Sequence, residues 1–262
     1  MSKISVVVII IILSLTAIQS VEAQYNIQTP AMKPKAPKKD SWAVGGMADL
    51  NFSSEYIWRG VELNHEWVMQ PAARISEKGL ELSALGNMDL TSSNGCEGKF
   101  TRWIYKGGLA HRVEDGGAGI FYTYYDNRDV GYPKTQEVSI EVEYGYPFFG
   151  GGDMVYDWDN ANGFYFRTKM GYIGEIGILS IIPQVSVSFA TNQYQEFYFG
   201  VHEDSFVDVV VSLRAELNVV SGLFVYAEGN YYELCKSALR SSEVNVKQGE
   251  NFYWQGGAAF RF

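Results

Sequence analysis

Apolar side chains recur at every second position over long stretches of this sequence. In the clearest case, every odd-numbered residue from Val207 to Val219 is apolar, whereas most of the even-numbered residues between them are polar or charged. Such alternation indicates a β-strand with two unlike faces. Several runs reach about ten residues, longer than the usual strand of a soluble sheet and long enough for a tilted strand to cross a bilayer. The pattern therefore predicts strands with one face toward hydrocarbon and one toward water.

Short and long connections alternate between these strands. Tight connections are predicted at residues 76–79, 114–117, 147–153, 174–177 and 220–222, and longer polar ones at 53–66, 91–99, 126–135, 158–163, 191–204 and 233–250. Short turns on one side and long loops on the other are typical of outer-membrane barrels. We therefore predict an all-β, transmembrane up-and-down antiparallel β-barrel of about 12 strands over residues 41–262. A short strand near residues 154–158 leaves ten or fourteen strands as alternatives, and Pro71 and Pro183 are interpreted as bulges or strand starts.

A sheet in a membrane has to close on itself, because lipid cannot satisfy the N–H and C=O groups of an open edge. Aromatic residues make up 15% of the chain and the mean hydropathy is −0.11, as expected when only alternate residues face lipid. Aromatic girdles at the headgroup level are predicted from Tyr56, Trp58, Trp67, Tyr122, Tyr124, Tyr144, Tyr146, Phe164 and Tyr172. The alternative fold is a secreted, soluble β-sandwich.

The first 40 residues carry an export signal rather than a fold. Lys3 precedes a mostly apolar stretch, and Val21 and Ala23 place small residues before a cleavage point at Gln24. This pattern predicts a cleaved signal peptide over residues 1–23, with an uncleaved membrane anchor as the alternative. Residues 24–40 are rich in proline and lysine, which predicts a disordered spacer. The mature protein is thus expected in the cell outer membrane of a Gram-negative bacterium.

The charge balance argues against nucleic acid as a partner. The chain has a formal net charge of −9, and residues 41–262 hold 16 basic against 28 acidic residues, a balance of −12. The three histidines, His65, His111 and His202, are scattered without a convergent catalytic site, and Gly150–Gly152 is interpreted as a turn. We predict no enzymatic activity, no catalytic residues, no cofactor and no metal site.

Ionisable residues on the polar faces of the strands are the candidates for a function. They predict a porin-like channel for passive diffusion of small polar solutes or ions, with a mild cation preference from the acidic balance. Separate ladders of opposite charge would orient solutes, whereas charges that pair with one another would plug a narrow barrel, and both alternatives stay open. The predicted pore-lining residues are Asp49, Glu81, Asp89, Arg74, Arg102, Glu137, Glu141, Glu143, Arg167, Lys169, Asp208, Arg214, Glu216 and Glu228, and the same reasoning adds Lys106 and Arg261.

The two cysteines, Cys96 and Cys235, fall in predicted outside loops. Disulfides persist in exported proteins. A bridge between them would draw the two loops across the mouth of the barrel, and two separate thiols on distant loops are the alternative.

The end of the chain resembles the C-terminal signal of bacterial outer-membrane proteins. Trp254, Phe260 and Phe262 lie in an alternating run that ends in a terminal phenylalanine. The resemblance implies recognition by the barrel-assembly machinery and insertion into outer-membrane lipid.

Two further segments resemble known barrel families. The run Ser54-Glu55-Tyr56-Ile57-Trp58-Arg59-Gly60-Val61, followed by Gln70-Pro71 and by residues 79–82, resembles the opening hairpins of TorF-type porins. The run Phe197-Tyr198-Phe199-Gly200-Val201 is similar to MipA/OmpV-type barrels. The first resemblance implies a small channel. The second implies the alternative, a non-conducting outer-membrane barrel that acts as a scaffold for cell-wall enzymes.

Overall fold

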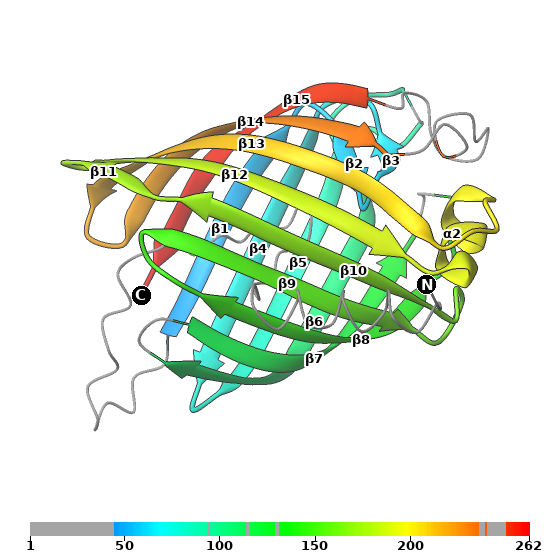
Figure 1. Cartoon of the computed structure of the whole chain (residues 1–262). Coiled ribbons are helices and arrows are strands. Elements are labelled where there is room, and N and C mark those ends of the chain that lie inside the picture. Colours follow the sequence, from blue (N-terminus) through cyan, green and yellow to red (C-terminus); the bar gives the residue numbers. More distant parts are fainter. Residues whose placement is uncertain (1–44, 94, 114–115, 129–130, 236–238, 240–249) are drawn as a thin grey trace.

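The computed structural model describes residues 45–93, 95–113, 116–128, 131–235, 239 and 250–262. The predicted signal peptide (1–23) and spacer (24–40) lie outside the described residues and stay predictions. Within the described residues, twelve long strands form one barrel (Figure 1). They are β1 (Gly45–Ser53), β4 (Val68–Glu77), β5 (Leu80–Asp89), β6 (Phe100–Val113), β7 (Gly116–Asn127), β8 (Thr135–Tyr144), β9 (Phe148–Asp157), β10 (Gly163–Tyr172), β12 (Leu179–Ala190), β13 (Ser205–Val220), β14 (Leu223–Leu234) and β15 (Glu250–Arg261).

The sheet closes into a ring in which every long strand has two antiparallel neighbours. Strands follow one another around the ring in chain order, β15 returns to β1, and β10 joins β12 directly. The short strand β11 (Gly174–Ile176) pairs with β12 beyond the end of the β10 ladder. The predicted all-β, up-and-down, twelve-strand barrel is confirmed, and the two-sheet sandwich is excluded.

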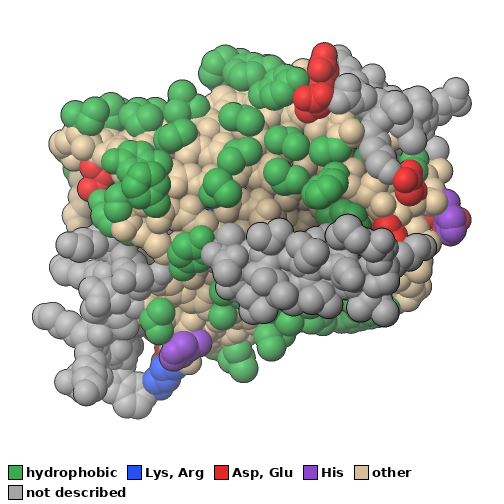
Figure 2. Space-filling model, viewed as in Figure 1, with side chains coloured by type: hydrophobic (Ala, Val, Ile, Leu, Met, Phe, Trp, Pro, Cys, Tyr) green, Lys and Arg blue, Asp and Glu red, His purple; other side chains and the backbone are tan. Residues whose placement is uncertain are grey.

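The outer wall is apolar, as the alternation predicted. Ile120 and Met170 are about three-fifths exposed, Leu109 about two-thirds, and Phe148 is 72% exposed. Figure 2 shows hydrophobic side chains spread over the wall, with acidic side chains near its ends. Such a surface needs hydrocarbon around it, because a soluble monomer seldom exposes so large an apolar area. Among the described residues, no helix is long and apolar enough to cross a membrane.

The predicted turn at residues 147–153 is wrong, because these residues mostly belong to β9. The turn consists of Gly145–Pro147, and the three glycines Gly150–Gly152 lie inside the strand. A Cβ atom on Gly150 would lie 2.8 Å from the Tyr144 hydroxyl, and one on Gly152 would lie 2.7 Å from a backbone oxygen of β10. The glycines therefore serve close packing within the sheet rather than a turn.

The two strand prolines mark neither bulges nor strand starts. Pro71 lies inside β4, where the residues on either side keep one register with β5. Pro183 lies inside β12, where its carbonyl faces Gly171 at the last pair of the β10 ladder. Its missing N–H therefore falls where pairing with β10 has ended, which avoids the loss of a ladder hydrogen bond.

The long connections all leave one end of the barrel, which we call the outer mouth. Among the described residues, the first of them holds β2 (Tyr56–Trp58) and β3 (Val61–Asn64), between β1 and β4, and another holds helix α2 (Asn192–Phe199), between β12 and β13. Figure 1 places both elements at the same end of the barrel. The two strands pair antiparallel, and we call residues 56–64 the β2–β3 hairpin.

Candidate functional site: the barrel lumen and its outer mouth

The ionisable residues predicted to line a pore lie on the inner wall of the barrel. Most of them are buried, whereas the apolar side chains at the alternate positions of the same strands are exposed. Since the apolar side chains cover the outside, the ionisable side chains point into the barrel. The wall from β1 to β8 carries Asp49, Arg74, Glu81, Asp89, Arg102, Lys106, Glu137, Glu141 and Glu143, and the wall from β10 to β15 carries Arg167, Lys169, Asp208, Arg214, Glu216, Glu228 and Arg261.

These charges pair with one another across neighbouring strands rather than forming separate ladders. Near the short turns, Glu81 on β5 contacts both Arg74 on β4 and Arg112 on β6, and the Arg112 Nε donates to Glu81 Oε1 over 2.8 Å. Arg112 also contacts Glu143, and Lys106 contacts Glu141. The sequence reasoning missed Arg112, which is next to the last residue of β6.

The other side of the lumen holds a second group of paired charges. Arg214 lies 3.0 Å from Glu216 and 3.5 Å from Glu228, and its guanidinium stacks 3.7 Å from the centre of the Tyr226 ring. The Tyr226 hydroxyl donates to Asp49 over 3.0 Å. The sequence left two alternatives open, separate ladders of opposite charge or charges that pair with one another. Among the residues that the structure describes, the charges named above pair with one another.

A chain of hydrogen-bonded polar side chains crosses the lumen wall from β1 to β6. Asn51 Nδ2 donates to Gln70 Oε1 over 2.9 Å, Gln70 Nε2 donates to Asn87 Oδ1 over 2.9 Å, and Asn87 Nδ2 donates to Thr101 over 3.0 Å. The four residues stand on β1, β4, β5 and β6, so each bond joins neighbouring strands. The sequence search, restricted to ionisable groups, missed this belt.

The outer half of the lumen is occupied by the β2–β3 hairpin. Arg59 and Gly60 form its two-residue turn, and both have positive φ, 52° and 79°. This is the geometry of the tight hairpin turns that match strand twist, and glycine adopts it without strain. The predicted girdle positions of Tyr56 and Trp58 are wrong, because these side chains are buried inside the barrel mouth instead of facing lipid. Of the other predicted girdle residues, Trp67, Tyr122, Tyr144, Phe164 and Tyr172 are exposed, and Tyr124 and Tyr146 are half-buried.

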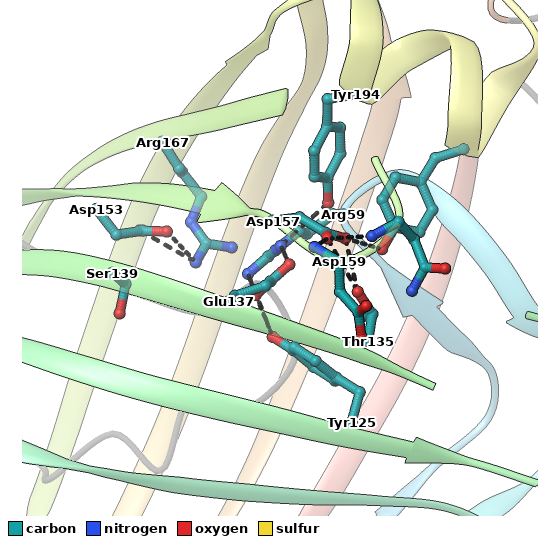
Figure 3. A network of polar contacts seen from close by, with 12 residues as sticks. Arg59, Tyr125, Thr135, Glu137, Ser139, Asp153, Asp157, Asp159, Arg167 and Tyr194 are labelled. Carbon is teal, nitrogen blue, oxygen red and sulfur yellow. Dashed lines mark hydrogen bonds and ion pairs between the residues drawn. The ribbon is translucent and has the colours of Figure 1, made fainter. Parts of the chain in front are cut away.

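Arg59 at the hairpin tip binds the inner wall through Glu137 on β8 (Figure 3). Its Nη1 lies 2.6 Å from Oε1 and its Nη2 lies 3.0 Å from Oε2, a bidentate pair. Tyr125 donates to the same carboxylate over 2.8 Å, and Arg59 Nη1 donates to the Tyr194 hydroxyl over 3.0 Å. Burial lowers the pKa of Arg59, but the Glu137 carboxylate together with Tyr125 and Tyr194 outweighs burial and raises this pKa well above its ordinary value.

Trp58 lies between two guanidinium groups. Arg102 on β6 and Arg59 stand 4.2 Å and 4.7 Å from the centre of its ring. Both distances are within the range of favourable cation–π contacts. Arg102 also donates to the Tyr56 hydroxyl over 3.1 Å. The hairpin is thus fixed to the wall by the aromatic side chains of β2 and by Arg59 of its turn.

Helix α2 packs beside the hairpin at the outer mouth. Its residues Tyr194, Tyr198 and Phe199 are buried, and the Tyr198 ring centre lies 5.2 Å from that of Trp58. The Tyr198 hydroxyl donates to Asp157 at the end of β9 over 3.1 Å. Burial raises the pKa of Tyr194 and of Tyr198 well above that of a free phenol, so both hydroxyls stay protonated. The hairpin and α2 together fill the outer mouth.

Arg59, Asp153 and Asp157 are further residues of the lumen that the sequence reasoning did not predict to line it. An X-Gly pair between apolar residues signals a two-residue hairpin turn, and Trp58-Arg59-Gly60-Val61 fits that signal. Asp153, which lies 3.2 Å from Arg167, was hidden because the preceding glycines were interpreted as a turn. The loop histidines offer no further site: His202 contacts Glu196, and within the described residues no cluster has the composition of a metal site.

The two cysteines lie in the outside loops where they were expected. Cys96 is buried in the loop between β5 and β6, and Cys235 is exposed directly after β14. The structure does not join these two sulfur atoms to each other. The bridge therefore stays a prediction, which mass spectrometry of protein from an oxidising compartment would decide.

A closed twelve-strand barrel with an apolar exterior and a polar lumen is the fold of outer-membrane porins. No protein-family model matches the sequence, and no curated protein matches it either. Neither the TorF-type nor the MipA/OmpV-type family is thus shown.

Solved porin structures share the fold over most of the chain. A NanC porin is 11% identical, with a TM-score of 0.51, and the match covers 83% of this chain and 99% of that one. A KdgM porin is 7% identical, with a TM-score of 0.51 and coverage of 82% and 99%. A KdgM porin in complex with disordered oligogalacturonate is 6% identical, with a TM-score of 0.50 and coverage of 83% and 99%. At these identities the similarity concerns the fold alone.

Proposed function

We propose that the protein is an outer-membrane channel for passive diffusion of small polar solutes or ions. The observation that carries this proposal is the closed barrel whose outer wall is apolar and whose inner wall carries ionisable and amide side chains. A purely structural barrel needs the apolar exterior but has no need of so many buried charges, which are costly to desolvate. One similar barrel is a KdgM porin in complex with oligogalacturonate, a polar solute.

The acidic balance supports a mild preference for cations. Residues 41–262 carry a formal charge of −12, and an excess of acidic groups on a channel protein raises the local concentration of cations around it. Purified protein in a planar bilayer would be measured under a salt gradient. We expect stepwise currents whose reversal potential lies toward the equilibrium potential of the cation. A reversal potential toward that of the anion would refute the preference for cations.

Location and assembly complete this proposal. The apolar outer wall would contact outer-membrane lipid, and the residues Trp254, Phe260 and Phe262 of the last strand would be read by the barrel-assembly machinery. All three side chains point outward and are exposed, as a signal on the lipid face requires. Export through a cleaved signal peptide would precede both steps.

A non-conducting scaffold for cell-wall enzymes is the second candidate. The filled outer mouth favours it, because the β2–β3 hairpin and α2 bury Tyr56, Trp58, Arg59, Tyr194 and Tyr198 inside the barrel. A correctly folded barrel that carries no current, together with specific retention of cell-wall enzymes, would support the scaffold over the channel.

A further inference from the structure

The tip of the β2–β3 hairpin reaches both sides of the lumen. Arg59 Nη2 donates to the Tyr125 hydroxyl on β7 over 3.3 Å. At the next residue, a Cβ atom on Gly60 would lie 3.0 Å from Leu234 Cδ2 on β14 and 3.2 Å from Val207 Cγ1 on β13. In the closed ring of twelve long strands, β7 and β14 stand half-way round from each other. Two consecutive residues therefore contact opposite walls.

A segment that contacts opposite walls leaves little room for a solute at that level. Trp58 and Ile57 are buried beside the tip, and α2 closes the space next to them with Tyr194 and Tyr198. No comparable segment enters the end of the barrel near the short turns within the described residues, where strands are joined by connections of a few residues. Among the described residues, the hairpin is therefore the chain segment that restricts the lumen.

We propose that the β2–β3 hairpin is the element that sets the size limit of this channel, and that Arg59 is the residue that positions it, through Glu137. The inference rests on the proposed channel function and extends it to a specific segment. It also gives a role to the run Ser54–Val61, whose Tyr56, Trp58, Arg59 and Gly60 supply the wall contacts and the turn.

Arg59 is suited to this role because its contacts are buried and mutually dependent. Without its guanidinium, the Glu137 carboxylate stays buried without its cation, and Trp58 loses one of its two cation–π partners. The hairpin would then leave the lumen more often. Loss of one member of a buried ion pair shifts such an equilibrium roughly 150- to 4,000-fold.

The size limit is tested by replacing residues 56–63 with a four-residue Gly-Ser linker and measuring single-channel currents in a planar bilayer. Heat-modifiable migration on a gel reports that each barrel is folded. We expect the linker variant to conduct at least about twofold more than the unmodified protein, because removal of the hairpin widens the constriction.

The outcomes separate this inference from the proposed function. Equal conductance of the two folded proteins overturns the inference and leaves the channel function intact. A silent unmodified protein with a conducting linker variant supports the hairpin as the obstruction and overturns the resident channel. Silence of both folded proteins overturns both.

The positioning role of Arg59 is tested by Arg59→Ala against Arg128→Ala. Arg128 is a matched control, because it is also an arginine at the outer mouth paired with an acid, Asp126, but half exposed. Arg59→Ala should show frequent transitions to the large conductance of the linker variant. Arg59→Lys should spend more time than Arg59→Ala at the smaller conductance of the unmodified protein. Currents of Arg59→Ala equal to those of Arg128→Ala would overturn the role of Arg59.

Discussion

Replacing Glu137 by glutamine removes the carboxylate that Arg59 and Tyr125 share. In the structure this carboxylate accepts two bonds from Arg59, of 2.6 and 3.0 Å, and one from Tyr125, of 2.8 Å. Glutamine has nearly the same shape but carries no charge and only one acceptor oxygen. The change therefore leaves the barrel wall intact and removes the charge that holds the hairpin tip.

The size of the effect follows from the burial of the pair. Both side chains are at most 2% exposed, so loss of one partner leaves a charge that water cannot reach while the hairpin stays docked. Breaking a buried ion pair costs about 3–5 kcal/mol. Glutamine keeps one acceptor, which places Glu137→Gln at the lower end, about 3 kcal/mol. We therefore expect undocking of the hairpin to become roughly 150-fold more frequent, at 1.4 kcal/mol for each factor of ten.

Hydrogen exchange followed by mass spectrometry measures this equilibrium directly. Amides of the β2–β3 hairpin should exchange roughly 150-fold faster in Glu137→Gln, while those of β12 should keep their rates. Glu143→Gln is the matched control, because Glu143 is on the same strand and its pair with Arg112 is 36% and 44% exposed. An exposed pair contributes about 1 kcal/mol or less. Equal hairpin exchange in the two variants would refute the reasoning.

Three further predictions concern the outer wall, the chain end and the outer mouth. Brominated lipid should quench the fluorescence of Trp254, which is 59% exposed on the outer wall, so Trp254→Phe should lose part of the quenching and Trp58→Phe should not. Phe262→Ala should lower the heat-modifiable, assembled fraction in cells, because Phe262 ends the run that resembles the assembly signal and its backbone pairs with Gly46; an unchanged fraction would argue against the signal. Docking of α2 should be intact below about pH 10 and weaken above it, because free phenols ionise there while burial raises the pKa of Tyr194 and Tyr198. Limited proteolysis between residues 191 and 204 across this range measures it, and cleavage independent of pH would contradict it.

The wall of the barrel could be predicted from the sequence because the pattern that specifies it lies within each strand. Each strand repeats its apolar and polar positions with period two, and the register follows once the turns are placed, as with Asp49 and Arg261 inside and Phe252 and Phe260 outside. Errors arose where a residue type has two uses. The glycines of β9 were interpreted as a turn, although they let Tyr144 and β10 pack closely.

The outer mouth was not accessible in the same way. Tyr56 and Trp58 have the composition of a girdle, and only the path of the chain into the lumen determines that they are buried there. Arg59 and Glu137 are 78 residues apart, and no local pattern links them.

The amino-acid sequence by itself indicated a closed barrel of about twelve strands, its apolar exterior and the ionisable character of its inner wall, because a membrane imposes these requirements on every strand separately. The tertiary structure alone decided which charges neutralise each other and where the loop between β1 and β4 lies. Those features depend on side chains from distant strands meeting in a space of low dielectric, where the strength of a contact is set by burial and geometry rather than by residue type.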